Sequence, residues 1–127
     1  MFVTSIPQYI QGLTNAKVDL TTTNVTTLYT APSDADFNAS IVSSMLVSED
    51  SGNADTITVT VTNGSDVFSL FKVKAVGANG TVELLTRDLI LQSAEILKVS
   101  AATANRLHVV ASIQELAKTR ISTSAIL

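Results

Sequence analysis

Residues 56–76 read TITVTVTNGSDVFSLFKVKAV, and this stretch decides the fold. Threonine alternates with isoleucine or valine as far as Thr62, which is a period of two built from β-branched residues. Such a pattern predicts a strand with one buried face. Asn63-Gly64 follows at once, and a second apolar run begins at Val67. The stretch therefore predicts a β-hairpin, because Asn-Gly suits the positive φ angles of a type I′ turn.

A two-residue loop at Asn63-Gly64 sets which residues of this hairpin face one another. It would place Ile57 opposite Leu70 and Val59 opposite Phe68, and directly opposed residues share a face of the sheet. We therefore predict that these two pairs belong to the core. The other face of the second strand is also apolar, and we expect the other sheet's rim, an arm or another subunit to cover it, at least near Phe71 and Val73. Its candidate interface residues are Val67, Phe71 and Val73.

Shorter β-rich runs recur about every ten residues, with turn residues such as Pro32 and the Gly-Ala-Asn-Gly stretch at 77–80 between them. Regularly spaced short strands are typical of sandwiches and jelly rolls. The sequence therefore predicts an all-β fold, an antiparallel β-sandwich or jelly roll of seven to eight strands. One helical turn is expected at 114–118. The further strand candidates are 25–30, 37–48, 81–86, 89–91, 95–101 and 107–113.

The two ends of the chain differ from its middle. We predict an extended N-terminal arm at 1–23, a β-sandwich domain at 24–117 and an extended C-terminal tail at 118–127. Both ends carry apolar side chains that water solvates poorly. They could be two frayed tails, or they could lie on a neighbouring subunit. In the second case the candidate interface residues are Phe2, Ile6, Tyr9, Ile126 and Leu127.

Charge is sparse along the chain. Charged residues make up 15% of the sequence, against about 25% in an average domain. The eight Lys and Arg residues are scattered, whereas nucleic-acid binding needs clustered cations, so no nucleic-acid partner is expected. No run approaches the roughly 20 apolar residues that span a bilayer, so no membrane partner is expected. A weakly charged, apolar-leaning surface is typical of a protein that a partner covers.

Residues suited to catalysis or metal binding are few. The chain has no cysteine, which excludes disulfides and thiolate metal sites. His108 is the only histidine, and it lies on the polar face of a predicted strand without a nucleophile motif such as G-x-S-x-G. We therefore predict a non-enzymatic protein without catalytic, metal-binding or cofactor-binding residues. Lys72 and Lys74 share one strand face, where they could protect a sheet edge from unwanted pairing.

Acidic residues gather in two predicted loops, one with Glu49, Asp50 and Asp55 and the other with Asp34 and Asp36. Calcium prefers such oxygen ligands. The spacings lack the alternation and the terminal glutamate of an EF-hand loop, which favours solvated turns over a calcium site.

The order of these elements resembles a β-sandwich module that is common among structural proteins of tailed bacteriophages. The resemblance covers about residues 24–115. In such modules a glycine often precedes the acidic residue that opens the penultimate strand, whereas here Ala94 precedes Glu95. The matching stretches are TLYTAP (27–32), the strand and loop at 41–53, TITVTVT (56–62), GTVELL with LIL (80–91), and EILKVSA followed by NRLHVVAS (95–112).

The resemblance implies a capsid decoration or cement protein in a virion that is assembled in the host cytoplasm. Its partners would be the major capsid protein, or another virion protein, and its own copies in a homo-oligomer such as a trimer. A tail, neck or fibre component is the first alternative. A carbohydrate-binding adhesin is the second, although sugar sites use exposed aromatic rings and the chain has 5% aromatic residues and no tryptophan.

Overall fold

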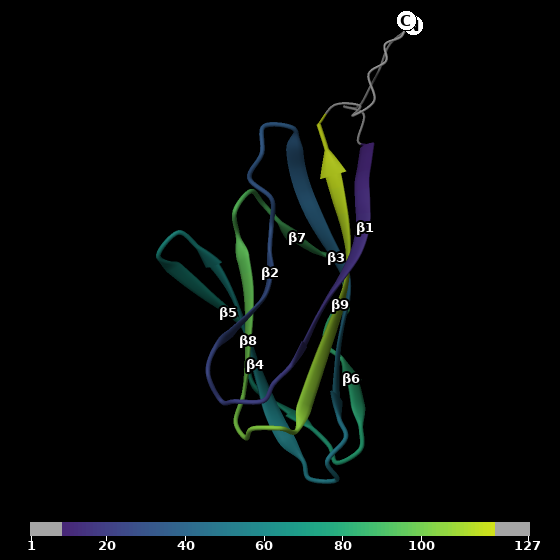
Figure 1. Cartoon of the computed structure of the whole chain (residues 1–127), viewed down its shortest axis with the longest axis vertical. Helices are drawn as coiled ribbons and strands as arrows, with labels where there is room; N and C mark the ends of the chain where they lie inside the picture. Colours follow the sequence, from purple (N-terminus) through teal and green to yellow (C-terminus); the bar gives the residue numbers. More distant parts are fainter. Residues whose placement is uncertain (1–8, 119–127) are drawn as a thin grey trace, which may run out of the picture.

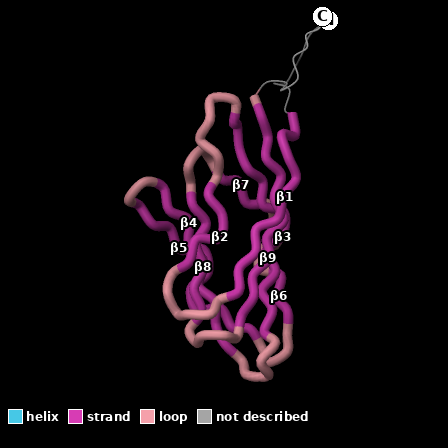
Figure 2. Tube along the Cα trace, in the orientation of Figure 1, coloured by secondary structure: helices cyan, strands magenta, loops and turns pink. Residues whose placement is uncertain are grey.

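The computed structural model describes residues 9–118 of the chain, which form two antiparallel sheets packed face to face (Figures 1 and 2). This part contains no helix, and so none that could cross a membrane. Nine strands make up the sandwich, which confirms the predicted all-β antiparallel architecture. The strands are β1 (Tyr9–Asp19), β2 (Thr26–Thr30), β3 (Phe37–Glu49), β4 (Asp55–Asn63), β5 (Asp66–Val76), β6 (Thr81–Glu83), β7 (Leu89–Leu91), β8 (Ile96–Ala101) and β9 (Leu107–Ala117).

The sheets divide the strands unequally. Sheet A has the order β1-β9-β3, and both β6 and β7 pair with the far side of β3. Sheet B has the order β2-β8-β4-β5. The two central pairings are long, since β3 faces β9 from Phe37 to Glu49 and β4 faces β8 from Ile57 to Thr62. Consequently β1 and β5 lie at outer edges of the sandwich, on sheets A and B respectively.

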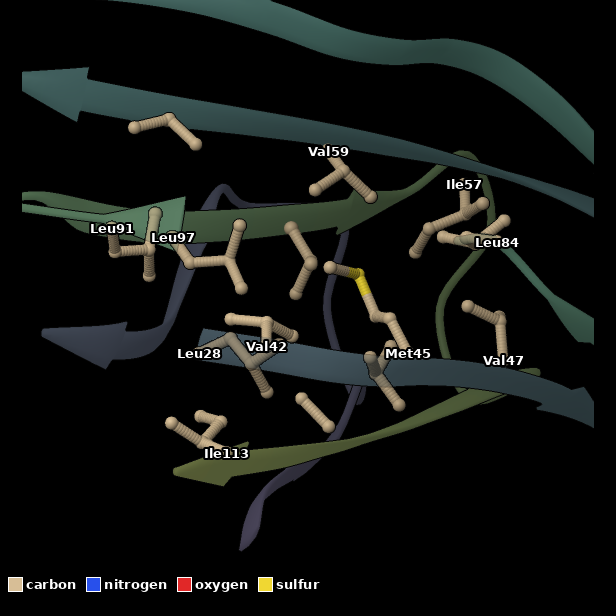
Figure 3. Close-up of a cluster of buried hydrophobic side chains, with 14 of the residues drawn as sticks. Leu28, Val42, Met45, Val47, Ile57, Val59, Leu84, Leu91, Leu97 and Ile113 are labelled. Atoms are coloured by element: carbon tan, nitrogen blue, oxygen red, sulfur yellow. The ribbon is translucent and has the colours of Figure 1, made fainter. Parts of the chain in front are cut away.

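The core lies between the sheets and follows the period-two patterns of the central strands (Figure 3). Each isoleucine and valine of the TITVTVT stretch points inward, and the threonines between them point outward. Met45 of β3 fills the middle of the opposite layer and is fully buried. Burying one such large apolar side chain stabilises a fold by roughly 1.5–3 kcal/mol. Other buried residues in this cluster are Leu28, Val42, Val47, Leu84, Leu91, Leu97 and Ile113.

The domain begins earlier than the sequence indicated. We expected an arm through residue 23, but residues 9–19 form β1 and pair with β9 over almost its whole length. Ala16 and Val18 pack against the core, and Leu20 is buried directly after the strand. The inward positions of β1 include glycine, at Gly12, and small side chains, so the sequence does not show a clear period-two pattern there. The rest of the predicted arm, residues 1–8, lies outside the described residues.

The chain also stays extended further along β9 than we expected. The predicted helical turn at 114–118 is wrong, because β9 continues to Ala117. Gln114 pairs with Leu13 of β1 and with Ile41 of β3, so neighbours on both sides hold this segment in the sheet. Beyond Lys118 the predicted C-terminal tail lies outside the described residues.

The β4–β5 hairpin is confirmed, but its turn differs from the prediction. Asn63 pairs with Asp66, so the two loop residues are Gly64 and Ser65. Gly64 has a φ of +62° while Ser65 keeps a negative φ. Glycine at the first central position with positive φ is the arrangement of a type II′ turn. This turn shifts the partners by two residues relative to the predicted loop.

Two bulges in β5 then change the partners again, and the predicted core pairs are wrong. Val59 faces Phe71, and Ile57 faces Lys74. Each bulge adds one residue to β5, and Val73 in the second has a φ of +55°. Its N–H donates to Thr58 Oγ1 over 3.1 Å, which helps to hold the bulge. A one-residue insertion turns the following side chains to the other face of a strand.

Candidate interaction surfaces

β5 presents exposed apolar side chains along an open edge. It is the outermost strand of sheet B, and the tip of its hairpin projects from the sandwich (Figure 1). Phe68 is 55% exposed, Val67 63%, Val73 59% and Leu70 37%. Val67 and Phe68 pair with Thr62 and Val61, so they lie on opposite faces of the strand. We call these four residues the β5 surface. Clustered apolar side chains on a sheet edge are typical of contact sites between proteins. The predicted edge lysines, Lys72 and Lys74, are exposed on either side of Val73.

A shallow groove of about 490 Å³ adjoins the β5 surface. Leu70 and Phe71 form one wall. Residues 82–89 form the other, and they run from β6 to the first residue of β7. Lys74 and Arg87 add two cations to the lining. Within residues 9–118 neither cation forms an ion pair. The lining also includes the carboxylates of Glu83 and Asp88, so the groove extends the apolar β5 surface toward sheet A with charges of both signs.

The outer face of sheet A is a second apolar surface. Leu13 on β1 is 72% exposed, and Ile90 on β7 is 61% exposed. Leu46 and Val110 lie between them on β3 and β9 and are partly exposed. These residues point away from the core because their neighbours along each strand point into it. Sequence patterns alone did not identify this surface, since its residues come from four separate strands.

The predicted interface residues fall into three groups. Val67 and Val73 are exposed on β5, and their interface role stays a prediction. Phe71 packs against the core instead, since the first bulge turns it inward. Tyr9 begins β1 and pairs with Ala117. Sequence reasoning missed Phe68, which it placed in the core. The remaining predicted residues lie outside the described residues: Phe2, Ile6, Ile126 and Leu127.

The acidic loop after β3 is built around one buried carboxylate. Glu49 accepts backbone N–H groups from Ser51 at 2.7 Å, Gly52 at 3.1 Å and Asn79 at 2.9 Å, and also the Ser51 hydroxyl. Burial alone would raise the pKa of Glu49, but these hydrogen bonds outweigh it and lower the pKa to about 2. Glu49 thus joins the loop after β3 to the 77–80 turn.

The other acidic residues of the two predicted loops also meet protein groups. Asp55 is buried and accepts the N–H of Thr103 at 3.0 Å. Asp34 and Asp36 lie in the turn before β3, where the backbone carbonyl of Asp34 accepts the N–H of Phe37. Within residues 9–118 no group of three or more His, Asp or Glu side chains is arranged to hold a metal ion.

His108 lies between two carboxylates. Its Nε2 is 3.3 Å from Asp19 Oδ1 and its Nδ1 is 3.6 Å from Asp50 Oδ2. The imidazole therefore joins β9 to the end of β1 and to the loop after β3. Both of its ion-pair partners are carboxylates, and Ser48 of β3 is its partner across the strand pair.

One polar network crosses the core from sheet to sheet. Tyr29 of β2 donates its hydroxyl to Glu115 Oε2 of β9 over 2.5 Å and lies 2.7 Å from Ser40 Oγ of β3. Burial, together with the hydrogen bond to Glu115, raises the pKa of Tyr29 well above its ordinary value. This network ties the edge strand of sheet B to the two central strands of sheet A.

Ala94 stands in an unusual backbone conformation before β8. Its φ is +65°, in the left-handed region that favours glycine. Glu95 stabilises the turn, since its carboxylate accepts the N–H of Gln92 at 2.7 Å and the side-chain amide of Asn63 at 3.1 Å. The turn thus has the shape that glycine allows at this position, although the chain carries alanine there.

Comparisons with known proteins concern the fold. No protein-family model matches the chain. No curated protein matches it either. Among solved structures it is similar to a chain of the acidic stable capsid structure of Helicobacter pylori bacteriophage KHP30, with 14% identity and a TM-score of 0.55 over 94% of this chain and 98% of that chain. It is also similar to a pentameric capsid protein isolated from metagenomic phage sequences, with 21% identity and a TM-score of 0.45 over 83% of this chain and 61% of that one.

Proposed function

We propose that this chain is a non-enzymatic structural protein of a bacteriophage virion, and that it decorates or cements the capsid. The observation that carries the proposal is the fold similarity to a chain of the KHP30 capsid, which extends over nearly the full length of both chains. The sandwich supports the same role, because its carboxylates and its histidine serve to hold loops and strands together.

The β5 surface is the part of the chain that would attach to the shell. Its side chains are apolar, and the strand edge beside them offers backbone groups for pairing. Interface cores are depleted of charge and enriched in aromatic residues. Phe68 fits this description, and Val67 and Val73 are exposed on the same strand. The partner would be the major capsid protein or another virion protein with a flat apolar patch.

The proposal includes contact between copies of the chain. A cementing protein links neighbouring positions on a closed shell, and homo-oligomers with closed symmetry are the common form of such self-association. The phage-module resemblance makes a trimer one expected size. The weakly charged surface favours close approach of identical copies, because few like charges would then face one another.

Binding to separated particle parts tests the proposal. The purified chain is mixed with empty heads and, separately, with tails of the phage that encodes it, and bound protein is measured by co-sedimentation. We expect saturable binding to heads in a fixed ratio. A variant with Val67→Lys and Val73→Lys should bind heads much more weakly, because two charges would have to lose water at the contact.

Val25→Lys provides the matched control for this experiment. Val25 is 66% exposed, as much as the β5 residues, but it lies in the loop before β2. This variant should bind heads as the natural chain does. Binding to tails instead of heads would support the tail, neck or fibre alternative. Absence of binding to both parts, together with recognition of sugars on a glycan array, would support the adhesin alternative.

A further inference from the structure

The outer face of sheet A is ordered in rows that cross its strands. Directly paired residues share a face, so the strand registers define each row. One row runs from Leu13 on β1 to Ile90 on β7, through Gln114 and Ile41. Nearer the 77–80 turn, a parallel row contains in order Lys17, Val110, Leu46 and Glu83.

Between these two rows the face carries small uncharged side chains. Asn15, Ser112 and Ser44 form the intermediate row. On the far side of the Leu13 row lie Ile10 and Leu116, which are also apolar. The rows of Ile10, Leu13 and Asn15 therefore carry no charged group, and in the next row the charges of Lys17 and Glu83 stand at the two ends.

We propose that two copies of the chain pack sheet A against sheet A around a two-fold axis that runs parallel to the strands. This axis reverses the strand order in the partner, so β1 lies over β6 and β7 while β9 lies over β3. Each row then faces the same row of the second copy, with the order of the strands reversed. The inference rests on the self-association that is part of the proposed function, and it assigns that contact to one surface.

The reversed rows match in both charge and polarity. Lys17 lies over Glu83 of the second copy, whose carboxylate is held by the N–H groups of Met45 and Leu85 and by the Ser44 hydroxyl. The same pair forms again on the other side of the axis. Val110 lies over Leu46 of the second copy, so apolar side chains meet at the centre. Leu13 lies over Ile90 of the second copy. A self-complementary patch of this kind is what a two-fold interface requires.

The next row toward the 77–80 turn is also compatible with this axis. It contains, in strand order, Asp19, His108, Ser48 and Thr81. Reversal places Asp19 over Thr81 of the second copy and His108 over Ser48, so like charges do not face one another. An axis perpendicular to the strands would instead place Lys17 over Leu13 of the partner if it passed through the Asn15 row, and over Lys17 if it passed through the Lys17 row, so in both cases the charge would be unpaired.

The size of the face suits such a contact. Four strand positions at about 4.8 Å spacing and eleven residues at about 3.3 Å each give a face of roughly 15 Å by 35 Å in projection. Side-chain relief makes its accessible area larger than this. Stable complexes bury about 800 Å² per partner. The projected area of the whole face is about 500 Å², so a contact that approaches this size must use the whole face rather than one row.

Sedimentation equilibrium of the isolated chain tests the inference. To remove association through β5, the starting protein carries Val67→Lys and Val73→Lys, and we expect it to form dimers. Adding Leu13→Lys should raise the dimer dissociation constant roughly 100-fold or more, because symmetry places the charge in the contact twice. Adding Val25→Lys instead should leave the constant unchanged. Adding Ile90→Asp to Leu13→Lys should restore most of the affinity, because each new lysine meets a new aspartate.

A strict monomer, a trimer without dimers, or no effect of Leu13→Lys would overturn the inference. A chain with Leu13→Cys and Ile90→Cys gives a second measurement, since the natural chain has no cysteine. A short bismaleimide should link its copies into dimers, and failure to do so counts against the inference. Head binding and dimerisation of the natural chain, measured side by side, separate the two proposals. If natural chains bind heads but never dimerise, only the inference fails, and if they dimerise without binding heads, the proposed function fails.

Discussion

Truncating the two phenylalanines of β5 should have opposite effects on folding and on assembly. Phe71 follows the first bulge, faces the fully buried Val59 and packs against the core. Phe68 precedes the bulge and is 55% exposed. We therefore expect Phe71→Ala to lower the free energy of unfolding more than Phe68→Ala does. We expect Phe68→Ala to weaken head binding more.

The magnitudes follow from burial. Truncating a fully buried phenylalanine costs 3–5 kcal/mol, from lost transfer energy and the cavity that remains. Phe71 is only partly buried, so we expect about 2 kcal/mol. Phe68 keeps more than half of its area in water, so its truncation should cost less than about 1 kcal/mol. The difference exceeds the scatter of surface substitutions, which is about 0.5 kcal/mol.

Urea unfolding followed by circular dichroism measures these costs. The urea concentration at the midpoint of unfolding should shift. The slope of the unfolding free energy against urea concentration should stay constant, since it reports the surface exposed on unfolding. The reasoning is refuted if Phe68→Ala destabilises the chain by 2 kcal/mol or more while Phe71→Ala has no effect. That result would mean that β5 continues without the first bulge, so that Phe71 points away from the core, and that Phe68, which shares the face of Val61, packs against the core.

Three further predictions concern Ala94, Glu49 and β1. Ala94→Gly should stabilise the chain by about 0.5–1 kcal/mol in urea unfolding, because glycine adopts positive φ without steric cost; unchanged or lower stability would contradict a left-handed Ala94. The hydrogen bonds to ionised Glu49 stabilise the fold above its ordinary pKa of 4.5, and this contribution is lost as the pH falls through about 2. Glu49→Gln should therefore be less stable at pH 7 and less sensitive to acid between these values, and an unchanged acid transition would contradict this. Deleting residues 1–23 should abolish or greatly lower the thermal transition, because it removes β1; a truncated chain of full stability would show that β1 is dispensable.

The sequence predicted the parts of this fold that depend on local pattern. The alternation around Val59 identified a strand with one buried face, and Gly64 identified the hairpin. Phe71 could not be placed, because a bulge depends on contacts between strands. Here the N–H of Val73 reaches the hydroxyl of Thr58, fifteen residues away. A valine at positive φ is uncommon, and a propensity-based prediction places it in a regular strand.

The candidate surfaces were partly predictable for the same reason. Val67 and Val73 lie on one strand, so a run of apolar residues pointed to them. The outer face of sheet A combines Leu13 and Ile90, which are far apart in the chain. They lie in one row only because of how the strands between them are aligned, and no local sequence pattern determines that alignment. β1 itself was hidden, since its inward side chains are small and its most exposed one is the large Leu13.

The low external charge of this protein follows from how its carboxylates are used. Glu49, Asp55, Glu83 and Glu95 each accept a backbone N–H in a loop or bulge, and Glu115 accepts the hydroxyl of Tyr29 inside the sandwich. Carboxylates bound in this way hold loops that would otherwise leave buried N–H groups without partners. The chain thus uses much of its acidic content to fix its own turns, and this leaves the β5 surface and most of the outer face of sheet A apolar and uncharged.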